Sequence, residues 1–101
     1  MRFRINETAG TATLLQSISD PTVPASQCCG SARRLSNGDW LIDWGQANKH
    51  PIGGYKPNGQ RTFLLTFPTH TSYRAEPVPP GAVSAQDLRN AMNARCSSGC
   101  G

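Results

Sequence analysis

The side chains that could carry chemistry in this 101-residue chain include two histidines, His50 and His70. His50 lies between two extended segments and His70 lies in a turn, and no acidic residue has an obvious spacing for orienting either ring. Loops carry binding and catalytic groups more often than cores do, so both histidines are candidate substrate-binding residues. The competing interpretation is that each is a solvent-exposed loop histidine.

Two arginines are better candidates for holding an anionic group. Arg33 lies on an expected strand and Arg74 on another, and a guanidinium group can donate two parallel hydrogen bonds to an oxyanion. The alternative is a structural salt bridge between strands, for example with Asp43 or Glu76. The sequence leaves both roles open.

The cysteines occur as an adjacent pair, Cys28 and Cys29, and a second pair, Cys96 and Cys100. An adjacent pair lacks the spacing of a zinc site, and the six acidic residues are too dispersed for a calcium site, so we expect no metal and no cofactor. Cys96 and Cys100 could close a small disulfide loop. Cys28 and Cys29 are also disulfide candidates, although a direct bond between them would close a strained eight-membered ring. We expect this pair to have a structural role just before the strand at 31–35. Redox activity and pairing between the two clusters remain open.

Two Asn-Gly pairs indicate tight hairpins, because both residues tolerate positive φ. They are Asn37-Gly38 and Asn58-Gly59, each set between extended apolar segments. Ser84 with Asp87 three residues later predicts a helix start at the end of the chain. The expected elements are strands at 2–6, 11–18, 31–35, 40–44, 52–55, 61–67 and 72–78, and a helix at 84–95.

This order predicts an all-β fold: one four-stranded antiparallel β-propeller blade with flanking strands and a short C-terminal helix. Residues 31–67 form the blade and residues 1–20 the outer strands of a preceding blade. Residues 72–78 belong to the next blade or to ring closure, 84–95 to the helix, and 96–101 to a flexible tail. One blade cannot close a ring, so its faces require neighbours.

Charge and hydropathy exclude several classes of protein. The net charge of +4 comes from scattered basic residues, without the stripe of a nucleic-acid module. A weak positive field would still attract anionic substrates. No apolar stretch approaches the ~20 residues of a membrane helix, and no signal peptide is visible in this chain.

Three segments resemble the C-terminal part of bacterial arylsulfotransferase-like proteins. They are 28–45 (CCGSARRLSNGDWLIDWG), 52–67 (IGGYKPNGQRTFLLTF) and 72–75 (SYRA), followed by a proline-rich exit to the helix. The likeness extends from about Arg4 to Arg95, and the first and third segments are specific in combination.

The resemblance implies a six-bladed propeller, secreted or periplasmic, that moves a sulfuryl group from a phenolic sulfate ester to a phenol through a sulfated histidine. It implies no nucleotide sulfate donor. This chain departs from the pattern because Gly30 stands where the family's histidine would fall. We therefore expect a terminal fragment, inactive alone, whose partners are the remaining blades of the same gene or another chain.

Other interpretations remain open beside this one. One is a non-catalytic propeller segment that binds ligands or proteins, and another is a small β protein that assembles with copies of itself. Trp40 and Trp44 share one strand face by the period of two, and they could form either an aromatic wall for a phenolic substrate or an inter-blade core.

Overall fold

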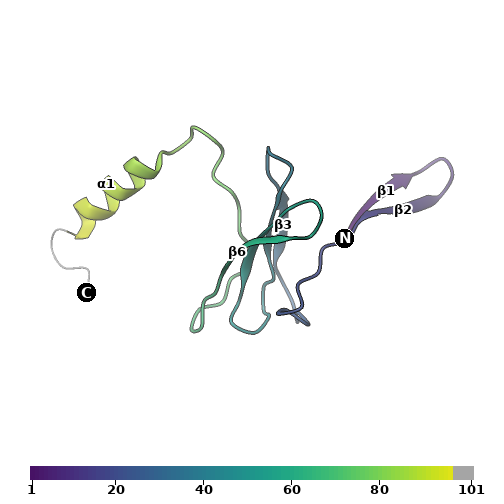
Figure 1. The fold of residues 1–101 in the computed structure, drawn as a ribbon, viewed down its shortest axis with the longest axis horizontal. Helices are drawn as coiled ribbons and strands as arrows, with labels where there is room; N and C mark the ends of the chain where they lie inside the picture. The colour runs from purple at the N-terminus through teal and green to yellow at the C-terminus, as the bar shows by residue number, and fades with distance from the viewer. Residues whose placement is uncertain (97–101) are drawn as a thin grey trace.

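The computed structural model describes residues 1–96 and arranges them as two antiparallel sheets and one helix (Figure 1). Strands β1 and β2 form a hairpin, and a second sheet has the sequential order β3-β4-β5-β6. The elements are β1 (Arg2–Asn6), β2 (Thr11–Gln16), β3 (Ser31–Arg34), β4 (Trp40–Asp43), β5 (Ile52–Tyr55), β6 (Arg61–Leu65) and α1 (Ala85–Cys96). The mainly β fold, the four-stranded antiparallel sheet and the C-terminal helix are therefore confirmed, whereas no propeller is shown.

Both Asn-Gly turns form where the sequence predicts them. At the first, the Leu35 N–H donates to the Asp39 carbonyl over 2.8 Å, and Gly38 has a φ of 91°. At the second, the Lys56 N–H donates to the Gln60 carbonyl over 2.8 Å, and Gly59 has a φ of 88°. Glycine adopts these left-handed angles without a steric cost, so the two turns fix the register of β3 with β4 and of β5 with β6.

Helix α1 begins with the predicted capping box. The Asp87 N–H donates to the Ser84 hydroxyl over 3.0 Å, and the Ser84 N–H donates back to the Asp87 carboxylate over 3.2 Å. No residue of the helix is buried, and Leu88 and Met92 are 52% and 65% exposed. Figure 1 shows α1 standing apart from the sheet, so capping rather than packing accounts for its formation.

The strand predicted at 72–78 does not form. Residues 71–79 lie in no helix or strand, although this segment runs past the start of β3. The Ala75 N–H donates to the Ser31 hydroxyl over 3.1 Å, and that hydroxyl donates to the Ala75 carbonyl over 2.9 Å. A side-chain hydroxyl thus satisfies the backbone groups that a strand would pair with β3, and the following prolines offer no N–H donors.

The described residues contain very little core. The buried apolar side chains are Val23, Ala47, Pro51 and Tyr55, and the molecule measures 61 × 32 × 23 Å. Its Cα radius of gyration is 17.2 Å, against about 13 Å for a compact chain of 100 residues. The elements are consequently held by strand pairing and by a few polar contacts more than by a shared apolar interior.

Candidate functional site

The two predicted anion-binding arginines converge on one carboxylate. Arg33 Nη2 lies 2.7 Å from Glu76 Oε1, and Arg74 Nη1 lies 3.9 Å from the same oxygen. The hydrogen bond and charge of Arg33 hold the pKa of Glu76 below its usual range. Of the two acidic partners considered from the sequence, Glu76 is the one that forms ion pairs with these arginines. The side chains of Arg33 and Arg74 nevertheless remain 42% and 54% exposed.

The two histidines occupy different loops. His50 is half-buried with a φ of 44°, and its Nδ1 lies 3.3 Å from the Gly45 carbonyl oxygen. His70 is exposed, and its Nδ1 lies 2.9 Å from the Thr69 hydroxyl. Within residues 1–96, no hydrogen bond joins either ring to a carboxylate. The arrangement therefore lacks the base and orienting acid of an activated nucleophile.

A buried polar cluster that the sequence did not indicate lies beside the sheet. The side chain of Asp20 is 2% exposed and accepts hydrogen bonds from three other residues. The Tyr55 hydroxyl donates over 2.7 Å, the Thr22 hydroxyl over 2.6 Å and Arg61 Nη1 over 3.0 Å. The cluster ties the segment before β3 to strand β5 and to the start of β6.

The cluster shifts two pKa values in opposite directions. Burial would raise the pKa of the Asp20 carboxyl, but hydrogen bonds from Thr22, Tyr55 and Arg61 outweigh it and hold the pKa well below its usual range. Burial and the hydrogen bond to Asp20 raise the pKa of Tyr55 to about 12. Near neutral pH the carboxylate is thus ionised and the phenol protonated. The hydrogen bonds hold the segment before β3 against β5 and β6, and we call this cluster the Asp20 anchor.

Trp44 completes this anchor. Its Nε1–H donates to the Tyr55 hydroxyl over 2.9 Å, and the two rings meet edge to face with centroids 6.0 Å apart. Sequence reasoning missed the cluster because Asp20 and its partner Tyr55 lie 35 residues apart. The one local signal is the Asp-Pro-Thr run at residues 20–22, in which the Thr22 N–H donates to Asp20 Oδ1 over 2.9 Å, as in an Asx-turn.

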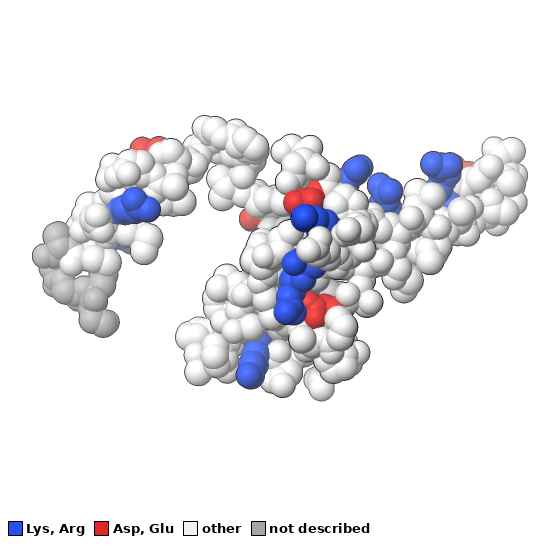
Figure 2. Space-filling model, in the orientation of Figure 1, with Lys and Arg blue, Asp and Glu red and all other residues white. Residues whose placement is uncertain are grey.

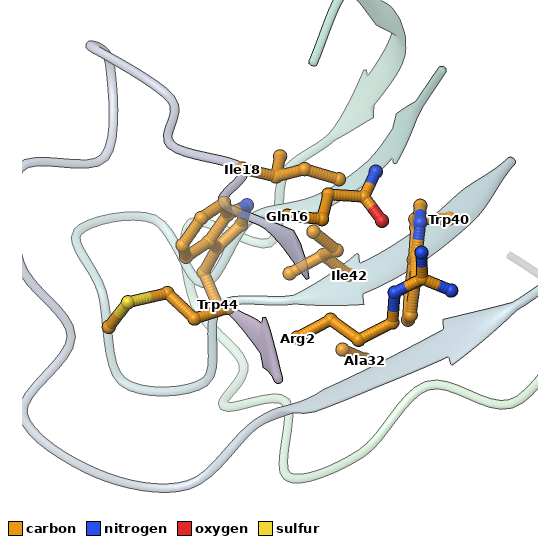
Figure 3. Close-up of a pocket in the computed structure, with 8 residues that line it drawn as sticks. Arg2, Gln16, Ile18, Ala32, Trp40, Ile42 and Trp44 are labelled. Atoms are coloured by element: carbon orange, nitrogen blue, oxygen red, sulfur yellow. The ribbon is translucent and has the colours of Figure 1, made fainter. Parts of the chain in front are cut away.

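A small apolar groove of about 110 Å³ lies between the β1–β2 hairpin and strand β4 (Figure 3). Trp40, Ile42 and Trp44 line it, so Trp40 and Trp44 lie on one face, as the period of two predicts. Both tryptophans are half-buried. The remaining lining residues are Met1, Arg2, Gln16, Ile18 and Ala32. The groove therefore joins an aromatic wall to polar groups of the hairpin.

Cys28 and Cys29 are joined directly by a disulfide, which closes the eight-membered ring considered from the sequence. Cys29 adopts a φ of 68° and the next residue, Gly30, a φ of 103°, so the backbone accommodates the turn at the bond. The predicted pairing of Cys96 with Cys100, like the flexible tail, involves residues outside the described range. Residues 1–96 contain no group of three or more His, Cys, Asp or Glu side chains suited to a metal.

The distribution of basic side chains and the length of the helix match what the sequence predicts. On the face shown in Figure 2, basic side chains are distributed over the hairpin, the sheet and the helix, with acidic groups between those on the sheet. Among residues 1–96, no helix has the length and apolarity needed to span a bilayer. Comparison with family models, with curated proteins and with solved structures finds no match for this chain.

Proposed function

We propose that this chain is a non-catalytic blade of an arylsulfotransferase-like β-propeller, in which other blades supply the histidine for sulfuryl transfer. The observation that carries the proposal is the four-stranded meander β3-β4-β5-β6 with uncovered apolar residues. A propeller blade has the same strand number and sequential order, and it gains its core by packing against neighbouring blades. The segments that resemble the family, 28–45 and 52–67, contain this meander.

The outer strand supports the need for a neighbour. Phe63 and Leu65 alternate along β6 and are 49% and 50% exposed. Burying a phenylalanine or leucine side chain contributes about 1.5–3 kcal/mol, so two such side chains on one strand leave a substantial stabilisation unused. Trp40 and Trp44, both half-buried, add apolar surface along β4 and just after it.

The backbone explains why this blade would lack the nucleophile. Gly30 occupies the position where the family's histidine is expected, with a φ of 103°. A Cβ at this position would collide with the Asp43 carbonyl oxygen of the neighbouring strand. A histidine therefore does not fit here without a change in the backbone, and His50 and His70 lack orienting carboxylates within residues 1–96. We infer that the reacting histidine belongs to another blade.

Arg33 and Arg74 have a defined place in this proposal. Both are exposed enough to reach an anionic ester, but Glu76 competes for them. The proposal therefore assigns them a role in attracting the phenolic sulfate ester, with Glu76 lowering the affinity of the isolated chain for anions.

The test is co-expression of this chain with the segment encoded immediately upstream, followed by a sulfuryl-transfer assay from an aryl sulfate to a phenol. We expect transfer and a sulfated histidine in the co-expressed partner, and no mass gain of a sulfuryl group on this chain. Sulfation of His50 or His70 in the isolated chain would contradict the proposal, as would an upstream segment that encodes no blades.

A second candidate is a non-catalytic segment that binds ligands or proteins, which the groove at Trp40 and Trp44 favours. It predicts a stable complex with upstream blades that never becomes sulfated. The Trp40→Ala variant separates the two, because it would weaken ligand binding in a binding module. In an enzyme whose reacting histidine lies elsewhere, it would leave histidine sulfation detectable.

A further inference from the structure

The Cys28–Cys29 disulfide lies in an exposed loop between the Asp20 anchor and strand β3. It joins sequence neighbours, so the loop that it closes is the shortest a disulfide can close. In the chain-entropy account, stabilisation by a disulfide grows with the length of the closed loop. This bond therefore restricts the unfolded chain very little, and its effect is confined to the local backbone.

That local backbone is a junction of three segments. The Cys28 carbonyl accepts a hydrogen bond from the Gln46 N–H over 3.0 Å, in the loop that follows β4. The Gly30 N–H donates to the Tyr73 carbonyl over 3.1 Å, in the segment that carries Arg74 and Glu76. The backbone at Cys29 also packs closely against Gly45, in the loop after β4. A Cβ at Gly45 would lie 2.7 Å from the Cys29 carbonyl carbon.

We propose that Cys28–Cys29 is a reduction-sensitive site that controls how firmly these two segments are held. The reductant is a small or protein dithiol. One of its thiolates attacks a cysteine sulfur, which breaks the disulfide and forms a mixed disulfide. Its second thiolate then displaces the bound cysteine. The dithiol is oxidised to a disulfide, and the chain gains two electrons and two protons as two adjacent thiols.

Reduction changes the backbone because of the conformation at Cys29. A non-glycine residue with a φ of 68° is disfavoured by the contact of its Cβ with the carbonyl oxygen. The disulfide ring holds Cys29 in this conformation, and its removal lets the residue relax toward negative φ. The carbonyl of Cys28 and the N–H of Gly30 then turn away from Gln46 and Tyr73, so both segments are released together.

The test uses the full chain with Cys96→Ser and Cys100→Ser, which leaves only the adjacent cysteines. The chain is equilibrated in dithiol buffers, separated from the dithiol by gel filtration, and then treated with phenylarsine oxide, which condenses with two neighbouring thiols and releases water. We expect no arsenical on the oxidised chain and one per chain after reduction. Amide hydrogen exchange at Gln46 and Gly30 should rise by about tenfold or more on reduction, because local opening sets the exchange rate.

A chain with all four cysteines replaced by serine is the matched control. It should bind no arsenical, and its amide hydrogen exchange should not change when the reductant is added. Two results would overturn the proposal. One is a failure of the Cys96→Ser/Cys100→Ser chain to bind the arsenical after reduction. The other is arsenical binding with unchanged exchange at Gln46 and Gly30, which would make the bond chemically accessible but without structural effect.

Discussion

At the scale of single residues, the Tyr55 hydroxyl links two side chains that are distant in the sequence. This group is fully buried, donates to the Asp20 carboxylate and accepts from the Trp44 indole. Each partner is itself buried or half-buried, so it has little access to replacement water. A buried polar group that loses its partner bears a desolvation cost. Removing this hydroxyl should therefore lower the free energy of unfolding more than removing an exposed hydroxyl.

The Tyr55→Phe variant tests this directly. It removes one donor to Asp20 and the acceptor of Trp44, so we expect the free energy of unfolding to fall by about 1–3 kcal/mol. Urea unfolding followed by tryptophan fluorescence, at one fixed protein concentration, measures the change. Tyr73→Phe is the matched control, because Tyr73 is 69% exposed and should change stability by no more than about 0.5 kcal/mol. Equal effects of the two substitutions would contradict the assignment.

The Asp20 carboxyl predicts a pH dependence. Its pKa is lower in the folded chain than the value of about 3.9 for an unfolded aspartate. The unfolded state therefore binds more protons between these two values, and stability falls as the pH drops through this range. The contribution of Asp20 is fully present above pH ~5 and is lost in acid.

Asp20→Asn isolates this contribution, because Glu76 and Asp87, whose pKa values are also lowered, remain in the variant. We expect the variant to be less stable than the parent chain at pH 7, with a difference that shrinks toward pH 2. Urea midpoints measured across this pH range provide the check. A difference that is constant with pH would show that the carboxylate charge plays no part.

At the scale of elements, strand β5 depends on two adjacent glycines. The Tyr55 ring lies over Gly53, and a Cβ there would be 2.5 Å from the Tyr55 hydroxyl oxygen. On the other face the Phe63 ring of β6 covers Gly54, which is its direct partner in the ladder. Aromatic side chains thus cover the backbone where β5 has no side chains of its own.

Gly53→Ala should therefore destabilise the meander by about 1–3 kcal/mol, because the added methyl group displaces the Tyr55 ring from Asp20. The same urea titration measures this, and the near-UV circular dichroism of Trp44 should weaken. Gly81→Ala is the control for backbone strain without a steric contact, since Gly81 has a φ of 81°, its Cβ would meet nothing within 4 Å, and its loop lies outside the sheets. If Gly81→Ala had the larger effect on the meander, the packing explanation would be wrong.

The elements also show what sequence reasoning can reach. The two Asn-Gly hairpins and the Ser84–Asp87 capping box are local signals, and the structure forms all three. The segment at 72–78 was expected to be a strand because its composition suits one. Composition does not determine whether another strand will pair with this segment. In the structure the Ser31 hydroxyl, rather than the backbone of a strand, binds the N–H and the carbonyl of Ala75.

The candidate site was less accessible to sequence reasoning. Arg33 and Arg74 could be named from their chemistry, but their shared contact with Glu76 was one of several open pairings. The Asp20–Tyr55 hydrogen bond joins residues 35 positions apart, and no local pattern announces it. The direct Cys28–Cys29 bond depends on the φ of Cys29, which the sequence does not specify.

At the scale of the whole molecule, the arrangement is extended and exposes large apolar side chains on β1, β2, β6 and α1. Ile5 on β1 is 64% exposed, Leu14 on β2 is 50% exposed, and Phe63 on β6 is 49% exposed. A two-stranded hairpin is only marginally stable alone in water, and within residues 1–96 the strands β1 and β2 pair with no other strand. These surfaces are therefore expected to pack against other polypeptide, whether further blades or copies of this chain.

Small-angle X-ray scattering over a series of protein concentrations tests this need for neighbours most directly. If the meander and the hairpin lack cover, the forward scattering per unit mass will rise with concentration as apolar faces associate. The apparent mass will then exceed the 10.9 kDa of one chain. A mass of one chain at every concentration, with a radius of gyration near the ~13 Å of a compact domain, would contradict the account.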